Sequence, residues 1–292
     1  MDVEELMKNK KKHYRTFKIP KHRDGLMRVP GRKKGAMRTI CAPDAAMKDA
    51  QKNILYGVLY KYKPTKYATG FRKGYNIVWN AKPHSKSIIT IRVDIKDFFP
   101  SITREMILKR FRGKFELVAD LCTLDDKLPQ GAPTSPALAN LVAARLDYRL
   151  AGLARKNDAV YTRYADDLIF SSATNRELNR MIPVIYAIVR EEGFEPNEDK
   201  TKVMRRGQRM EVTGLTVNER PNVPRKKWRA FRAIMHNYLM DLRNGKIAPA
   251  KVPLQQLDGY AAFVMSVNRS KGEQALRKIA EIREEMRAHA AG

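Results

Sequence analysis

The chain lacks the features of secreted, disulfide-stapled and membrane proteins. Its 292 residues include only two cysteines, Cys41 and Cys122, and their spacing fits neither a metal site nor a disulfide framework. No apolar run approaches the roughly 18 residues of a membrane span. The basic N-terminus also has no apolar signal-peptide region, and we find no internal repeat. These absences favour a soluble cytoplasmic protein with no membrane partner.

Acidic residues are also scarce. The sequence has 58 lysines and arginines against 31 aspartates and glutamates, which gives a formal net charge of +27. An excess of this size indicates a polyanionic partner such as nucleic acid, but it says nothing about the fold. Because 43% of the residues are hydrophobic, the chain has ample material for a packed core and is not a disordered basic tail.

Three of the few acids form the most informative pattern. Asp166 and Asp167 lie between two short β-rich segments, where a hairpin would reverse, and Asp94 lies near the end of another, residues 87–95. Neighbouring strands would bring the three carboxylates together, and like charges repel unless a cation compensates them. Mg²⁺ prefers such oxygen ligands, and two Mg²⁺ ions can activate a hydroxyl and stabilise leaving pyrophosphate. The pattern therefore predicts polymerase chemistry, whereas an isolated Asp-Asp pair would indicate only a turn.

The remaining pattern predicts an α+β fold. Strands that carry carboxylates are flanked by helices and followed by a helical C-terminal third. A glycine-bounded basic segment at residues 31–35 separates two short predicted strands and reads as a hairpin tip. Helical periodicity covers residues 45–60, 135–153, 179–192 and most of the chain from 224 onward, and β-like stretches cover 27–30, 36–40 and 210–217.

Two further loops contain residues suited to a nucleotide site. Phe99, in the Asp-Ile-Lys-Asp-Phe-Phe-Pro run at 94–100, could lie under a bound sugar, or it could simply pack in the core. Gln130 and Gly131 lie in Leu-Pro-Gln-Gly-Ala-Pro-Thr-Ser-Pro, just before a helix. Glycine permits a base pair or ribose to approach the backbone, and glutamine offers a donor and an acceptor. The alternative is an ordinary loop that caps the helix.

Taken with Tyr-Ala-Asp-Asp at 164–167, these runs resemble, in order, the palm motifs of reverse transcriptases. Asn-Ala-Lys-Pro-His at 80–84 resembles the Asn-Ala-x-x-His signature of bacterial retron reverse transcriptases, and Val-Thr-Gly at 212–214 resembles their Val-Thr-Gly triplet. The resemblance is weaker in the C-terminal helices. It implies a right-hand polymerase with fingers in residues 1–87, a palm in 88–217 with further fingers elements inserted at about 103–127, and a mostly helical thumb in 218–292.

The resemblance also implies roles at the active site. Asp94, Asp166 and Asp167 would bind two Mg²⁺ ions, and Arg38 would clamp the triphosphate of a dNTP, with Arg32, Lys33 or Lys34 as further candidates. Phe99 would exclude a 2′-OH, Gln130 and Gly131 would line the pocket, and Lys200 would protonate the leaving pyrophosphate. Two of these residues have simpler readings, since Arg38 could be a solvated strand charge and Lys200 one charge in a mixed run.

The implied RNA contacts come from three places. The two signatures contribute Asn80, His84, Val212, Thr213 and Gly214, although a lone histidine is more often structural. The helix that follows Pro224 has an apolar face, and its opposite face offers cations to a nucleic-acid backbone. The cations we assign to RNA binding there are Arg225, Arg229 and Arg232.

The resemblance finally implies a retron enzyme that copies a cognate structured non-coding RNA, which also provides the primer, into multicopy single-stranded DNA. Because the C-terminal third predicts neither the sheet nor the carboxylate cluster of an RNase H domain, we expect host RNase H to clear the template. An effector protein in anti-phage defence is a further expected partner. The alternatives are a group II intron enzyme, which would normally have a longer maturase region, another defence-associated reverse transcriptase, or a non-catalytic RNA-binding scaffold, against which the intact aspartate trio argues.

Overall fold

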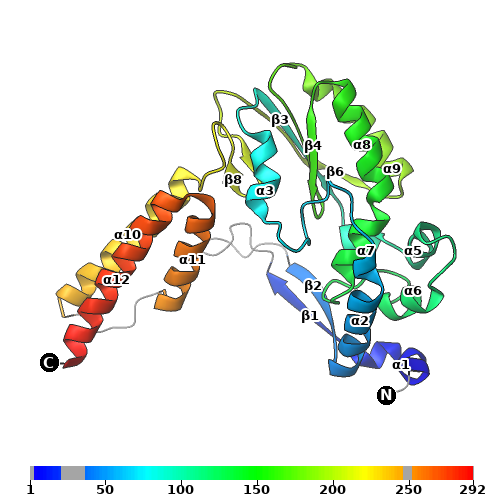
Figure 1. Ribbon diagram of the computed structural model, residues 1–292, viewed down its shortest axis with the longest axis horizontal. Coiled ribbons are helices and arrows are strands. Elements are labelled where there is room, and N and C mark those ends of the chain that lie inside the picture. The colour runs from blue at the N-terminus through cyan, green and yellow to red at the C-terminus, as the bar shows by residue number, and fades with distance from the viewer. Residues whose placement is uncertain (1–2, 21–36, 246–251, 292) are drawn as a thin grey trace.

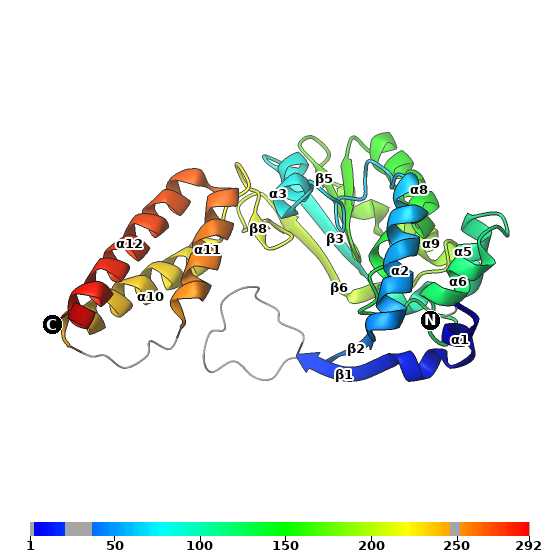
Figure 2. The same cartoon turned by 60° about the horizontal axis from the view of Figure 1, so that its bottom comes forward.

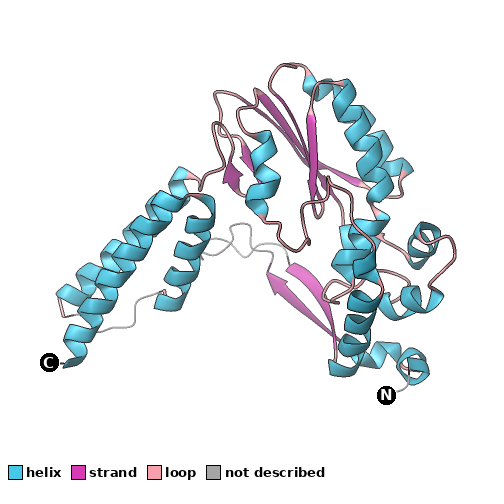
Figure 3. Ribbon diagram, in the orientation of Figure 1, coloured by secondary structure: helices cyan, strands magenta, loops and turns pink. Residues whose placement is uncertain are grey.

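The computed structural model describes residues 3–20, 37–245 and 252–291 (Figure 1). Its centre is a four-stranded antiparallel sheet with the strand order β4-β5-β3-β6. Both neighbours of β3 run antiparallel to it. Figure 3 shows the helices gathered around this sheet and in a separate group at the C-terminus, as the α+β prediction requires. The strands are β3 (Ile89–Ile95), β4 (Val160–Tyr164), β5 (Asp167–Ser172) and β6 (Pro196–Arg205).

The alternation of side chains along β3 gives the sheet one apolar face. Ile89, Ile91, Val93 and Ile95 are all buried in the main core, so Asp94 points to the opposite face, as predicted. Helices cover the apolar face, and Figure 1 shows α8 and α9 lying along it. The helix predicted at 135–153 is divided at Ala143. The helices that contribute to this core include α7 (Ser135–Val142), α8 (Ala144–Lys156) and α9 (Ile182–Glu191), with a 3₁₀ turn, η4 (Leu178–Met181), before α9.

The second face of the sheet is covered by two short segments from distant parts of the sequence. One is α3 (Ile77–Ala81), followed by the 3₁₀ turn η3 (Lys82–His84), and the other is the hairpin of β7 (Glu211–Val212) and β8 (Leu215–Thr216). Figure 1 shows both on the same side of the sheet. We call them the signature cover, because they contain the Asn-Ala-x-x-His and Val-Thr-Gly runs. Their shared core consists of Ala81, Ile169, Met210, Val212, Leu215 and Val217.

The N-terminal region adds a two-stranded antiparallel ribbon beside the sheet (Figure 2). The partner of β2 (Met37–Pro43) is β1 (Tyr14–Pro20). The predicted strand at 27–30 and the basic segment at 31–35 lie outside the described residues. The other elements of this region are α1 (Val3–Lys8), η1 (Lys10–His13), α2 (Ala45–Gly57), η2 (Leu59–Lys61), α4 (Phe98–Ser101), α5 (Arg104–Arg110) and α6 (Glu116–Cys122).

The C-terminal helices pack around a core of their own. They are α10 (Arg225–Arg243), α11 (Leu254–Val267) and α12 (Arg269–Ala291), and Figure 1 shows them to one side of the sheet. Partly buried Phe263 and Val267 touch both this core and the signature cover, so they join the two parts. On α10 the buried stripe is Trp228, Phe231, Met235 and Leu239.

Among the described residues, no helix combines the length and the apolar character that crossing a bilayer would require.

Candidate active site

The three predicted carboxylates meet at one end of the central sheet. Asp94 on β3 lies directly opposite Asp167 on β5. The backbone N–H of Ile95 donates to the carbonyl of Asp166, at 3.0 Å. Ala165 takes a left-handed conformation (φ 57°), which allows the chain to reverse tightly between β4 and β5. The sequence prediction that a hairpin turn would present Asp166 and Asp167 beside Asp94 is therefore correct.

Two of these carboxylates already have cationic partners. Asp167 Oδ1 accepts a hydrogen bond from Arg92 Nε at 2.8 Å, and Nη2 of the same guanidinium lies 2.7 Å from Oδ1 in an ion pair. Asp94 Oδ2 accepts from Lys200 Nζ and from Asn197 Nδ2, each at 3.0 Å. Arg92 reaches the site because it lies two residues before Asp94 on β3 and so shares its face. These ion pairs reduce the repulsion that three clustered carboxylates would otherwise produce.

The donor set is chemically suited to Mg²⁺, because it consists of carboxylate oxygens alone. As the side chains stand, however, no three His, Cys, Asp or Glu groups among the described residues converge tightly enough to hold a metal ion. Arg92 and Lys200 instead pair with Asp167 and Asp94 individually.

The environment of the turn favours the protonated form of two carboxyl groups. Burial, and secondarily the charge of Asp94, raises the pKa of Asp166, while the guanidinium of Arg38 acts in the opposite direction. Burial raises the pKa of Asp167 to about 6, although Arg92 partly offsets this. A cation that replaced these protons would relieve the same unfavourable charge.

A cavity of about 640 Å³ lies between β2, the segment at 96–101 that follows Asp94, and the loop at 127–130. Arg38 and Gln130 both line it. Lys96 and Lys127 add positive charge and Asp97 and Glu195 add negative charge, none of which the sequence reasoning found. The full lining is Met37, Arg38, Thr39, Lys96, Asp97, Pro100, Ser101, Lys127, Gln130 and Glu195.

Gly131 makes a close backbone contact that the sequence did not predict. Its φ is 138°, and a Cβ built on it would lie 2.8 Å from the carbonyl oxygen of Cys41. The neighbouring Gln130 carbonyl accepts a hydrogen bond from the Cys41 N–H at 2.9 Å. The absence of a side chain therefore lets β2 approach the loop. The predicted place of Gly131 in the lining of a nucleotide pocket stays a prediction.

Phe99 is half-buried next to Pro100, which lines the cavity. Its ring lies 5.8 Å from that of Phe98 and 5.6 Å from that of Phe71. Phe99 thus packs, as the simpler reading of the sequence proposed, and it keeps part of its ring accessible at the edge of the pocket. Both readings are compatible with this position.

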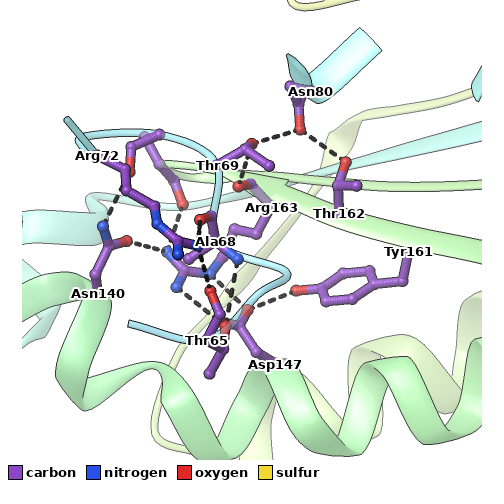
Figure 4. A network of polar contacts seen from close by, with 12 residues as sticks. Thr65, Ala68, Thr69, Arg72, Asn80, Asn140, Asp147, Tyr161, Thr162 and Arg163 are labelled. Carbon is purple, nitrogen blue, oxygen red and sulfur yellow. Dashed lines mark hydrogen bonds and ion pairs between the residues drawn. The ribbon is translucent and has the colours of Figure 1, made fainter. Parts of the chain in front are cut away.

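Behind the catalytic turn lies a buried polar network that the sequence reasoning did not find (Figure 4). Arg163, the residue before Tyr164, forms a two-pronged ion pair with Asp147 on α8, with Nε–Oδ1 and Nη2–Oδ2 distances of 2.7 and 2.8 Å. Both side chains are fully buried. Nη1 of Arg163 also donates to Asn140 Oδ1 at 3.1 Å and to the carbonyl of Ala165 at 3.3 Å. The network therefore holds the backbone of the turn itself.

The Asn-Ala-x-x-His run belongs to the same buried region. Asn80 Oδ1 accepts from the hydroxyls of Thr69 and Thr162, each at 2.7 Å. The two ring nitrogens of His84 contact Ser171 Oγ at 2.7 Å and Thr162 Oγ1 at 2.8 Å. Burial lowers the pKa of His84 to about 3, so its ring is neutral at physiological pH. His84 thus contacts both strands of the β4–β5 hairpin, which we call the catalytic hairpin, whereas Asn80 joins β4 to Thr69.

These positions correct part of the predicted RNA interface. Asn80, His84 and Val212 are each 0% exposed, which contradicts direct contact between their side chains and RNA. Thr213 and Gly214 form the tip of the β7–β8 hairpin, with φ values of 46° and 81°, and remain partly exposed. The three α10 cations, Arg225, Arg229 and Arg232, are exposed. They flank the buried stripe instead of lying opposite it as predicted, and Arg229 and Arg232 line a cavity together with Trp228 and Met235 of that stripe.

Comparison with known protein families agrees with this geometry. The family model described as "Reverse transcriptase (RNA-dependent DNA polymerase)" matches residues 19–217, which include the carboxylate trio, the pocket loop and both signatures. The chain belongs to the reverse transcriptase family. The predicted fold class, an α+β polymerase of the right-hand type, is thereby confirmed.

Curated relatives place the similarity among retron enzymes. The chain is 33% identical to the retron Ec86 reverse transcriptase of Escherichia coli, over 80% of this chain and 72% of that protein. It is 34% identical to the retron Mx65 reverse transcriptase of Myxococcus xanthus, over 91% of this chain and 64% of that protein. It is 35% identical to the retron Mx162 reverse transcriptase of the same organism, over 92% of this chain and 61% of that protein. The chain thus spans less than two thirds of the length of the two Myxococcus relatives.

Proposed function

We propose that this protein is the RNA-directed DNA polymerase of a retron. The observation that carries the proposal is the position of Asp94 opposite Asp167 in a reverse-transcriptase palm, beside a pocket lined by Arg38 and Gln130. The similarity to three retron enzymes over most of this chain supports the retron type. A non-catalytic scaffold is less well supported, because the chain retains all three carboxylates together with a pocket that Arg38 and Gln130 line.

Each residue of the site is assigned one role in the reaction. Asp94, Asp166 and Asp167 would hold two Mg²⁺ ions, which when bound supply charge neutralisation at the attacking hydroxyl and the leaving pyrophosphate. Arg38 would bind triphosphate oxygens, since a guanidinium can donate two parallel hydrogen bonds to phosphate. Lys200 is 3.0 Å from Asp94 and half-exposed, so it can turn toward the pyrophosphate and donate a proton.

The selection of deoxyribonucleotides is assigned to Phe99. Its ring is held from behind by Phe98 and Phe71, so it cannot retreat readily from a bulkier sugar. A ribose 2′-OH would press against a ring with packed neighbours, whereas a deoxyribose would not. Gln130 would line the remainder of the pocket, with its own backbone fixed by Cys41.

The division into fingers (1–87, with about 103–127), palm (88–217) and thumb (218–292) is part of the proposal. In this division the thumb consists of α10, α11 and α12. Arg225, Arg229 and Arg232 would contact the nucleic-acid backbone, since all three are exposed cations along one side of the packed stripe of α10. Thr213 and Gly214, at a partly exposed hairpin tip, would contact RNA through backbone groups.

The proposed partners follow from the retron type. The enzyme would copy a cognate structured RNA that also primes synthesis, starting from a 2′-OH of a guanosine in that RNA. Its product would be a short DNA joined to the RNA, and host RNase H would remove the copied template. A role in anti-phage defence, together with an effector protein, completes the proposal.

The test is primer extension with purified protein, its copurifying RNA, dNTPs and Mg²⁺, with Asp94→Asn as the control. We expect DNA synthesis by the parent protein and none by the variant. Sequencing of the product should show a single structured RNA as template, and digestion of the RNA should leave a ribonucleotide on the DNA end. DNA without that branch would favour another bacterial reverse transcriptase, and absence of synthesis on every template would favour an RNA-binding scaffold.

A further inference from the structure

Large aromatic side chains are exposed where the chain enters the signature cover. Phe71, Tyr75 and Trp79 are 45%, 37% and 55% exposed, although each could bury considerable apolar area. Trp79 is one of two tryptophans in the sequence, and the other, Trp228, is only 8% exposed. Several large aromatics exposed within nine residues mark a surface that binds something.

The exposed rings are held in place from below. Asn76 accepts hydrogen bonds from the N–H groups of Val78 and Trp79, which fixes the start of α3. The other side of this helix is buried, since Asn80 and Ala81 are 0% exposed. Trp79 therefore faces outward on an anchored helix.

The rings of Tyr75 and Trp79 form a pair, with centroids 5.4 Å apart and planes tilted by 41°. The guanidinium of Arg72 lies 4.3 Å from the centre of the Tyr75 ring and also donates to the Thr65 carbonyl at 3.1 Å. Aromatic faces beside a fixed cation are the groups that stack on nucleobases and attract their phosphates.

The charge around the pair selects the class of ligand. Residues 50–93 contain no aspartate or glutamate, whereas lysine and arginine recur throughout. Lys73 and Lys82, on either side of the aromatic pair in the sequence, are both exposed. We therefore expect this segment to bind a polyanion, and not a neutral ligand or a protein surface with few acidic residues.

The aromatic pair is also continuous with the polymerase site. The Phe71 ring contacts Phe99 at 5.6 Å. At Gly70 an added Cβ would lie 2.8 Å from the backbone nitrogen of Ala165, so this segment packs directly on the catalytic turn. A strand that leaves the site along residues 70–79 would meet Tyr75 and Trp79.

We propose that Tyr75 and Trp79 form a stacking site for unpaired bases of single-stranded nucleic acid beside the polymerase site, with Arg72 contacting the phosphates. The inference rests on the proposed polymerase function, because that function identifies the bound strand. The strand is an unpaired part of the RNA that the enzyme copies. The ligand is single-stranded because base faces in a duplex are already stacked and cannot lie on the rings.

The test measures binding without catalysis, by tryptophan fluorescence of the full chain titrated with a short oligo(U) strand. We expect quenching in the parent protein and in Asp94→Asn, and loss of most of the quenching in Trp79→Phe. By competition, Trp79→Ala and Tyr75→Ala should each weaken oligo(U) binding by about 5- to 100-fold, the range expected for one stacked base. A matched RNA duplex should show no such difference.

The control is Tyr148→Ala, because Tyr148 is 63% exposed on α8, on the opposite face of the sheet. It should leave oligo(U) binding unchanged. Unchanged affinity in Trp79→Ala, equal quenching in Trp79→Phe, or equal losses for duplex and single strand would overturn the proposal and leave the rings as a surface for a protein partner. Quenching without DNA synthesis on any template would instead reject the polymerase function while supporting the stacking site.

Discussion

Arg163 and Asp147 form an ion pair from which solvent is fully excluded, directly behind the catalytic turn. Burial alone would lower the pKa of Arg163, but the charge and hydrogen bonds of Asp147 outweigh it, and the net pKa is raised. Asp147 is also satisfied by the hydroxyls of Thr65 and Tyr161, at 2.6 and 2.9 Å. Each buried charge is thus neutralised by the other.

Asp147→Asn should therefore destabilise the protein severely. It leaves the buried guanidinium without a counter-charge, which typically costs about 3–5 kcal/mol. The free energy of unfolding in urea measures the loss. The double variant Arg163→Met with Asp147→Leu should lose much less stability, because no charge is then left unpaired. We expect this folded double variant to extend primers slowly, since the Ala165 carbonyl has lost its donor. If the loss of unfolding free energy in the double variant equalled the sum of the losses in the two single variants, the two residues would not be coupled.

The carboxylate trio should separate chemistry from binding. Asp94→Asn or Asp166→Asn should reduce DNA synthesis to background, because a neutral amide is a poor ligand for Mg²⁺. RNA affinity should remain near that of the parent protein, since it comes from distributed lysines and arginines. Extension assays and filter binding on the same preparations measure the two properties. Polymerase activity retained in either variant would reject the metal-ligand assignment.

Phe99 should control sugar selection. In Phe99→Val the barrier to a 2′-OH is removed, so the ratio of ribonucleotide to deoxyribonucleotide incorporation should rise more than the overall rate falls. Phe98→Leu is the matched control, because Phe98 is buried behind Phe99 and its loss should reduce stability rather than selectivity. Single-nucleotide incorporation with dNTP and rNTP measures the ratio. Unchanged discrimination in Phe99→Val would identify it as a packing residue.

Asp167 should make the metal-free protein less stable as the pH rises. Its folded pKa of about 6 exceeds the ordinary value of 3.8, so between these values the folded state binds the proton that the unfolded state has lost. The unfolding free energy contributed by this group should therefore fall between about pH 4 and pH 6. Asp167→Asn should be more stable than the parent at pH 7, by at most about 3 kcal/mol, and equally stable at pH 4.

Thermal unfolding in a chelating buffer at the two pH values measures this difference. Saturating Mg²⁺ provides the control, because a cation that binds the trio should stabilise the parent protein more than the variant. Equal stability of the two proteins at pH 4 and at pH 7 would contradict the raised pKa.

The sequence allowed the reactive centre to be located because its signals are local. Alternation along β3 is enough to place Asp94 opposite the core, and a β-rich segment on each side of Asp166 and Asp167 is enough to predict the hairpin. The same alternation could have identified Arg92, two residues before Asp94, as a member of the site. An arginine on a strand of so basic a chain does not stand out by itself, since 58 of the 292 residues are lysine or arginine.

The remainder depended on contacts between distant segments. The partners of Asn80 and His84 in the catalytic hairpin lie about 80 residues away, so no local pattern distinguishes their burial from exposure to RNA. The edge strand β6 was not predicted, because its side chains are mostly exposed and show little apolar alternation. The sequence did contain one signal of this network, since Asp147 lies among the apolar positions of α8. A buried acid at such a position indicates a buried cationic partner.

The signature cover has a consequence for exchanging parts between related enzymes. Thr213 Oγ1 donates to the Ile77 carbonyl at 3.3 Å, and the N–H of Lys86 donates to the Val217 carbonyl at 3.2 Å. The two runs are far apart in the sequence but share one small core, and that core also touches the C-terminal helices through Phe263 and Val267. A chimera that imports either run alone would join two surfaces shaped for other partners. Residues 77–86 and 210–217 would therefore have to be exchanged together, with the residues of β5 and the C-terminal helices that share their core.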